Sequence, residues 1–387
     1  MSRATRPATA ALVALASALL AVECRTTQGP GTAPSAALEA PPSDLETAAF
    51  DALIGATEAA RGLSFVQRPV LEVLDEGDPR FAAVRAAMAF ALEGGGGPSG
   101  GVSAERVAVD AARARIVALR PVAPEQVRLA LAFLLDAQHY PTLVDAARRA
   151  TGDVGLTLRG LLLGSALATA GGGLGPPPEA PATPAADPLA GPRFRGDEAL
   201  AGLLGPLPAL AAQGYLRGRE DREAAFRAPP LSTEQLLRPA EGHGADRPVW
   251  LAGAIATPPG CAVASDESVG LYTLLRALVQ RGAEVPARGL GAWSGDRLVR
   301  WRCGEDSASW LYVAELEDEA GARAFAAAAP ELLPLDLGGE PILQRRGRRV
   351  VVSVGLAAAD ADAIARRLEA VELRSAEQAI ALTGGGP

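Results

Sequence analysis

Apolar residues recur every three or four positions in many segments of the chain, which is the spacing of one buried helix face. The clearest example is the run 124–138, where Pro124 and Glu125 suit a first helical turn and leucines follow at helical spacing. Ser232, with Gln235 three residues later, forms a capping box and predicts that a helix begins in STEQLL. Helical spacing also predicts a helix or pair of helices over 143–170, and helices over 44–61, 82–93, 197–217, 220–227, 267–281, 318–329 and 359–370.

Shorter apolar runs and alternating positions predict strands. They lie at 66–74, 297–303, 310–315 and 348–356, and as two extended runs around a turn within 106–119. The neighbouring segments 297–303 and 310–315 can pair as an antiparallel hairpin. Helices and strands in this mixed order predict an α+β protein with small antiparallel sheets and a C-terminal α+β portion.

Glycine- and proline-rich segments divide the chain. The segments 94–101 and 171–192 cannot supply core residues, so we expect a surface loop and a linker there. The chain therefore divides into an N-terminal part, 44–170, and a C-terminal part, 193–372, followed by a flexible tail over 373–387. A length of 387 residues is enough to bury a core without a metal or disulfides.

Composition excludes several classes of function. Thirty-seven basic residues against 45 acidic ones give a net charge of −8, which argues against a nucleic-acid partner. Every basic residue is an arginine, because the chain contains no lysine, so a lysine Schiff base and a phosphate-loop lysine are both excluded. The chain has only two histidines, His139 and His243, far apart in the sequence. A metal site built on two neighbouring histidines is therefore excluded, and we expect no cofactor.

The N-terminus is similar to that of a bacterial lipoprotein. Two arginines precede an apolar stretch over 8–22, Cys24 follows it, and a polar, Pro/Gly-rich segment comes next. This predicts a signal peptide over 1–23, a lipid on Cys24 that binds the membrane, and a tether over 24–43. Glu23 is larger than the residue usually found before such a cysteine, so ordinary secretion or an uncleaved anchor remain alternatives. Each alternative predicts export, and the lipid predicts attachment in the cell envelope, facing the periplasm or the cell surface.

Export also bears on the two remaining cysteines. An oxidising compartment allows Cys261 and Cys303 to form a disulfide. Two free, buried thiols are the alternative.

The segment QVRLALAFLLDAQHY, residues 126–140, resembles the active-site helix of exported bacterial HExxH zinc metallopeptidase-like (gluzincin-type) proteins, whose helix reads like HELTHALQDQHF. The likeness extends in order from about residue 45 to residue 370. It includes VAVDAARARIVAL before the helix, AARRATGDVGLTLRGLLL after it, and then FRAPPLSTEQLLRP, DESVGLYTLL and AWSGDRLVRW. The resemblance implies a mainly helical metallopeptidase-like core and a zinc-dependent peptidase ancestry.

The residues that would carry out zinc chemistry are absent from the matching positions. The alignment places the family's first histidine, glutamate and second histidine on Leu129, Ala130 and Phe133, and its third ligand on Thr151. Zinc hydrolysis needs two imidazoles one turn apart, a carboxylate base and a third ligand. Leucine and phenylalanine offer no lone pair, and alanine cannot act as a base. We therefore expect no catalytic zinc and interpret this helix face as core.

Other polar and aromatic residues have both a functional and a structural interpretation. His139 could pair with Asp136 as a base and its orienting group, although a histidine at a helix C-terminus is the commoner arrangement. Asp153, kept from the family motif, has a structural role by default, and His243 lies in a glycine-flanked segment typical of solvated surface. Clustered tryptophans could form a ligand platform, but we expect them to fill core; they are Trp293, Trp301 and Trp310.

Three hypotheses follow. The first is a catalytically inactive metallopeptidase homologue, tethered to the membrane, that binds a peptide or a partner protein. The second is a hydrolase with relocated chemistry, using a metal other than zinc near His139, Asp153, His243 or Asp110. The third is a structural envelope lipoprotein whose cleft is filled by side chains.

Overall fold

The structure is a computed structural model that describes residues 47–84, 106–170, 207–217, 222–237, 247–274, 292–304, 308–332 and 340–383. Several predictions lie outside these ranges. They are the signal peptide 1–23, Cys24, the tether 24–43, most of the helix over 82–93, the loop 94–101, the linker 171–192, the first half of the helix over 197–217, His243 and residues 384–387 of the tail.

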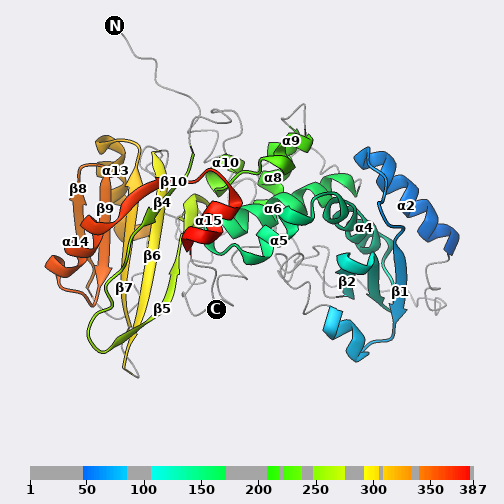
Figure 1. The fold of residues 1–387 in the computed structure, drawn as a ribbon, viewed down its shortest axis with the longest axis horizontal. Coiled ribbons are helices and arrows are strands. Elements are labelled where there is room, and N and C mark those ends of the chain that lie inside the picture. Colours follow the sequence, from blue (N-terminus) through cyan, green and yellow to red (C-terminus); the bar gives the residue numbers. More distant parts are fainter. Residues whose placement is uncertain are drawn as a thin grey trace, which may run out of the picture.

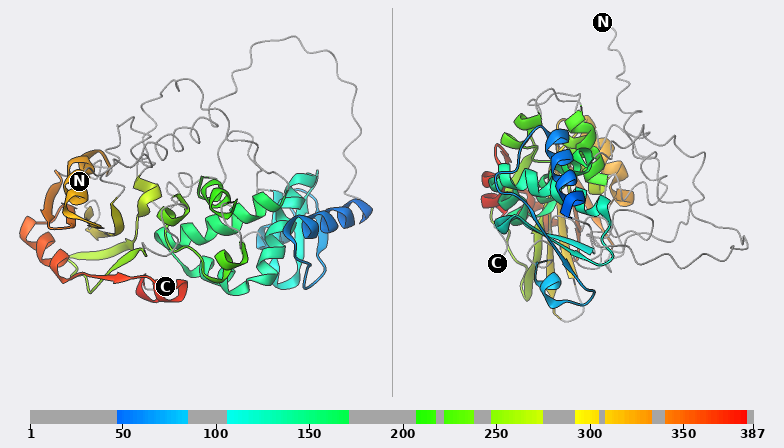
Figure 2. Two further views of the ribbon diagram at one scale, coloured as in Figure 1. Left: turned by 90° about the horizontal axis from the view of Figure 1, so that it is seen from above. Right: turned by 90° about the vertical axis from the view of Figure 1, so that its right-hand side faces the viewer.

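The molecule is elongated, with one small sheet near one end, a larger sheet at the other and helices between them (Figure 1). Figure 2 shows the same arrangement from above and from one end. The predicted α+β class is confirmed. No helix within the described ranges is long and apolar enough to cross a membrane.

The smaller sheet contains the predicted hairpin within 106–119. It has the order β1-β3-β2, with β1 parallel and β2 antiparallel to β3. Asp110 accepts a hydrogen bond from the Arg113 backbone N–H, and Ala114 adopts a left-handed φ of 48°, so the hairpin turns tightly. The elements at this end are α2 Thr47–Arg61, β1 Val70–Leu74, β2 Val107–Asp110, η3 Ala111–Arg113, β3 Arg115–Leu119 and α4 Pro124–His139.

A helical region follows, centred on α6, which is apolar and buried on nearly every face. The predicted helix or pair over 143–170 is a pair, because the chain turns at Gly152, where φ is +55°. Gly164 allows close packing of α6 on α8, since a Cβ there would lie 2.5 Å from the Ala209 carbonyl oxygen. The helices are α5 Pro141–Arg149, α6 Gly152–Thr169, α8 Leu207–Arg217, α9 Arg222–Arg227 and α10 Thr233–Leu237.

The larger sheet is wholly antiparallel, in the order β5-β6-β7-β9-β8, and includes the predicted hairpin β6–β7. Alternate residues of β7 face opposite sides: Tyr312 packs with Phe325 of α13, whereas Val313 packs with Ile364 of α14. The two helices therefore cover opposite faces. The elements are β5 Cys261–Glu267, β6 Trp293–Cys303, β7 Ala308–Leu316, α13 Glu319–Leu332, β8 Ile342–Arg346, β9 Arg349–Val354 and α14 Ala358–Arg367.

The end of the chain returns to the helical region, which corrects the prediction of a flexible tail over 373–387. Strand β10, Glu369–Glu372, pairs antiparallel with β4, Val249–Ala252. Helix α15, Ala376–Thr383, then buries Ala379 in the same apolar cluster as α4. The predicted helix over 359–370 is accordingly too long at its C-terminus, since residues 369–370 belong to β10.

Two further boundaries differ from the prediction. The helix predicted over 267–281 starts only at Gly270, because Glu267 is the last residue of β5, and residues beyond 274 lie outside the described ranges. Strands β4, β5, β8 and β10 were not predicted. Strands β5, β8 and β10 are mostly partly exposed, so no long apolar run marks them in the sequence. Strand β4 is apolar but only four residues long.

Cys261 and Cys303 form a disulfide between directly opposed positions of β5 and β6, with their Cα atoms 4.1 Å apart. It fastens an edge strand to the sheet. We expect Cys261→Ser with Cys303→Ser to lower the free energy of unfolding by about 2–4 kcal/mol, because the unfolded chain loses its cross-link. Urea denaturation of the oxidised protein and the variant would measure this, and equal midpoints would contradict it.

The predicted core role of the three tryptophans is confirmed. Trp293 and Trp310 pack on the α13 side of the sheet, and Trp301 packs on the α14 side. All three are buried, so they do not form a surface platform for a ligand.

Candidate functional site

The positions of α4 that the sequence analysis aligned with a metallopeptidase motif lie inside the protein core. Leu129, Ala130 and Phe133 of α4 are 6%, 1% and 0% exposed and belong to one apolar cluster. The prediction that this face of the helix is core is confirmed. Thr151, the matching third position, is exposed just before α6 and lies outside that cluster.

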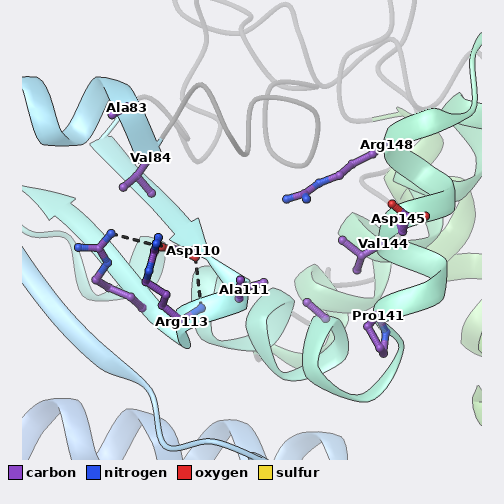
Figure 3. A pocket seen from close by; sticks show the side chains of 12 residues that line it. Ala83, Val84, Asp110, Ala111, Arg113, Pro141, Val144, Asp145 and Arg148 are labelled. Carbon is purple, nitrogen blue, oxygen red and sulfur yellow. Dashed lines mark hydrogen bonds and ion pairs between the residues drawn. The ribbon is translucent and has the colours of Figure 1, made fainter. Parts of the chain in front are cut away.

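A cavity of about 510 Å³ lies beside the last turn of α4, between the β2–β3 hairpin and α5 (Figure 3). Its apolar lining comes from all three elements and from the segment after β1. The lining residues are Ala83, Val84, Ala111, Ala112, Ala137, Pro141 and Val144, with Asp110, Arg113, Arg115, Asp145 and Arg148 as the polar members.

Asp110 organises the hairpin wall of the cavity. Its carboxylate accepts hydrogen bonds from Arg113 Nη1 at 3.0 Å and from Arg115 Nη2 at 3.2 Å. Burial opposes ionisation of Asp110, but the hydrogen bonds from Arg113 and Arg115 outweigh it and lower its pKa. A second ion pair, from Arg115 to Glu72 at 2.9 Å, holds Arg115 in place. Asp110 is therefore a fixed anion and a weak base.

Arg148 supplies a guanidinium from the opposite wall. It extends from α5 towards the hairpin, whereas Asp145, one turn earlier, pairs with Arg149 at 2.7 Å (Figure 3). The cavity therefore combines an apolar floor with guanidinium groups on two walls. Among the described residues that line it there is no serine, threonine, cysteine or histidine. This arrangement suits binding of a group with an apolar part and an anionic part.

His139 and Asp136 do not form the proposed catalytic pair. His139 Nε2 lies 2.8 Å from the Ser64 carbonyl oxygen, at the end of α4. Asp136 is fully buried and accepts a hydrogen bond from Arg61 Nε at 2.8 Å. Burial raises the pKa of Asp136, and the Arg61 charge opposes that shift. The sequence could not identify this partner, since 75 residues separate Arg61 from Asp136.

Asp153 has the structural role predicted by default. Its carboxylate accepts hydrogen bonds from the Thr233 backbone N–H at 3.1 Å and from Thr233 Oγ1 at 2.6 Å. Burial raises the pKa of Asp153 to about 7, and the nearby charge of Asp296 adds to the shift. The carboxylate therefore fastens α6 to α10 in the interior.

Asp296 is a fully buried carboxylate that sequence reasoning missed. It accepts hydrogen bonds from Ser268 Oγ at 2.8 Å, from the Val269 N–H at 2.8 Å and from Tyr312 Oη at 3.0 Å. Burial raises the pKa of Asp296, and these hydrogen bonds oppose the shift. Aspartate is uncommon in strands, so Asp296 beside the predicted strand 297–303, in AWSGDRLVRW, is the signal that could have revealed it.

Within the described ranges, no three histidine, cysteine, aspartate or glutamate side chains lie close enough together to hold a metal ion. The relocated metal site proposed near His139, Asp153, His243 or Asp110 therefore has no ligand cluster among the described residues. The three described candidate ligands bind other residues instead: His139 contacts Ser64, Asp153 contacts Thr233, and Asp110 contacts arginines.

None of the protein families, curated proteins or solved structures compared with this chain matches it. Its function must therefore follow from its own residues.

Proposed function

We propose that this chain is a metallopeptidase homologue without peptidase activity, which acts by binding a peptide or a segment of a partner protein. The burial of Leu129, Ala130 and Phe133 carries the proposal. A zinc ion on this helix would require imidazole and carboxylate groups at these positions. Apolar side chains there remove the ligands and also occupy the space that the metal and its water would need.

The cavity beside α4 supports binding as the remaining role. A volume of about 510 Å³ lies within the range of small-ligand pockets and would take one or two side chains of a peptide. The apolar floor would hold an aliphatic or aromatic side chain. Arg113 and Arg148, on opposite walls, would hold a carboxylate of the same segment.

The envelope setting belongs to the same proposal. A lipid on Cys24 and the tether over 24–43 would hold the binding domain near a membrane surface, where it meets exported or membrane-bound partners. A mainly helical metallopeptidase-like core is the inherited part, around α4 and α6. Three of the segments that carry the resemblance supply Asp153, Thr233 and Asp296, which meet in the interior and would preserve this inherited packing.

The absence of catalysis is tested on the chain from residue 25 to residue 387. We expect mass spectrometry to detect no stoichiometric metal, and an unstructured protein to remain uncut with or without added zinc. Stoichiometric metal that a chelator removes together with cleavage activity would contradict the proposal, and would favour the hydrolase with relocated chemistry.

Binding is tested separately, by fluorescence anisotropy of a labelled unstructured protein such as casein. Arg148→Glu should weaken binding about tenfold, because it reverses a charge at the cavity wall. Arg149→Glu is the matched control: it lies on the same helix, pairs with Asp145 and does not line the cavity. Equal affinity of both variants and the unchanged protein would exclude the cavity, and no binding at all would favour a structural role.

A further inference from the structure

Strands β8 and β9 and helix α14 lie at the end of the molecule opposite α2 and the small sheet (Figures 1 and 2). Arginines are concentrated in these elements. Four lie in the sequence QRRGRR, which forms the β8–β9 turn, and Arg366 lies in the last turn of α14. This concentration is unusual in a chain whose net charge is −8. It lies far from the cavity beside α4, so it is a separate feature.

The cluster surrounds a pocket of its own, of about 300 Å³. Strands β7 and β9 form its floor, and the β8–β9 turn and the end of α14 form its walls. The lining residues are Glu315, Arg346, Arg348, Arg349, Val351, Ala365 and Arg366.

Arg349 is the fixed member of the cluster. Its Nε donates to Glu315 at 2.9 Å, and its Nη1 donates to the Ala365 and Leu368 carbonyl oxygens at 2.6 and 2.9 Å. It therefore satisfies carbonyls at the C-terminus of α14 and neutralises the negative end of that helix. An anion in the pocket would not face an uncompensated helix C-terminus.

The three exposed arginines of the cluster, Arg346, Arg348 and Arg366, have fewer carboxylate partners than charges. Arg346 and Arg366 both pair with Asp362, and Arg348 lies 3.4 Å from Glu315, which already pairs with Arg349. Among the described residues, these four guanidinium groups share two carboxylates, which leaves two positive charges in excess. The side chains of Arg346, Arg348 and Arg366 are 55–57% exposed, so their outward N–H groups can reach a ligand.

We propose that this pocket binds a phosphate group. Guanidinium groups match the oxygen pairs of a phosphate through parallel hydrogen bonds, and guanidiniums from two walls can hold several oxygens of one group. The volume of about 300 Å³ accepts a phosphate ester or a diphosphate. The phosphate belongs either to a soluble molecule or to a lipid headgroup, which present the same chemistry. The site is independent of the peptide-binding role proposed above.

The test uses the chain from residue 25 onwards, which retains every described residue and lacks the predicted lipid site. Calorimetry with inorganic phosphate and pyrophosphate tests a soluble ligand. Flotation with phosphatidylglycerol-containing vesicles, against pure phosphatidylcholine vesicles, tests a headgroup. Binding in the first arm alone identifies a soluble phosphate, and binding to phosphatidylglycerol vesicles identifies a lipid.

The double variant Arg346→Gln with Arg348→Gln should weaken binding roughly tenfold for each guanidinium removed. The matched control is Arg68→Gln with Arg80→Gln, two exposed, ion-paired arginines at the other end of the molecule. Arg366→Gln, on a different element, repeats the test if the double variant misfolds by circular dichroism. The proposal would be overturned if the protein bound neither the soluble phosphates nor the phosphatidylglycerol vesicles. Unchanged binding by a folded variant would overturn it as well.

Discussion

Asp136→Ala is expected to lower the free energy of unfolding by about 3–5 kcal/mol, because it removes the principal partner of the buried Arg61 guanidinium. The side chains of Arg61 and Asp136 are only 3% and 0% exposed, and their ion pair is 2.8 Å long. Glu223 contacts the same guanidinium at 2.6 Å, but its side chain is partly exposed. Solvent therefore weakens the ion pair between Glu223 and Arg61. Urea denaturation would measure the loss from the midpoint at constant slope.

Two control variants make the result specific. Arg61→Met combined with Asp136→Ala removes both charges and should be less destabilised than Asp136→Ala alone. Asp145→Ala breaks an exposed ion pair with Arg149 and should cost no more than about 1 kcal/mol. A loss of less than about 1 kcal/mol in Asp136→Ala would contradict this prediction, and would show that Glu223 alone suffices as a partner for Arg61.

The free energy of unfolding is expected to fall as the pH rises from about 4 to about 7, owing to Asp153. Burial raises the pKa of Asp153 from 3.8 to about 7, with a further contribution from the charge of Asp296. The folded state therefore holds its proton more tightly than the unfolded state. The resulting stabilisation is complete below the unfolded pKa and is lost as the pH passes the folded pKa. Its size is on the order of 4 kcal/mol, at about 1.4 kcal/mol per pKa unit.

Asp153→Asn isolates this effect, because an amide does not titrate. The variant should show a flatter dependence of stability on pH between pH 4 and pH 7, measured by urea denaturation at several pH values. Burial also raises the pKa of Asp136 and of Asp296, so part of the slope should remain. Asp110, whose pKa is lowered, acts with the opposite sign and only at lower pH. Identical pH slopes in the variant and the unchanged protein would contradict the assignment.

The residues behind this pH dependence come from distant parts of the chain. Asp153, Thr233 and Asp296 lie in three separate segments and meet between the helical region and the larger sheet. Gly270 packs against Asp153, where a Cβ would collide with the carboxylate. These residues hold the two parts of the molecule together, which gives them a structural role.

Elements with a strong local sequence signal were predicted, whereas short elements that depend on distant partners were not. Helices with strong periodicity, such as α4, and strands with continuous apolar runs, such as β9, were predicted within a few residues. Strand β10 and helix α15 were missed or assigned to a tail, because each is short and partly exposed. Their order depends on β4 and α5, which lie more than a hundred residues earlier in the chain.

The sequence by itself determined the α+β class, the two hairpins and the apolar character of the helix over 124–138. Leu129, Ala130 and Phe133 carry no metal-binding atoms in any conformation, so their identity alone excludes a zinc site there. Local periodicity and side-chain chemistry are properties of neighbouring residues, and a sequence displays them directly.

Only the tertiary structure decided which distant residues meet. It joined Arg61 to Asp136, brought Asp153 and Asp296 together, closed the disulfide between Cys261 and Cys303, and gathered the arginines around the pocket beside α14. A charge pattern along the chain does not specify its partners, because burial and long-range packing set which ion pairs form and which guanidiniums stay exposed.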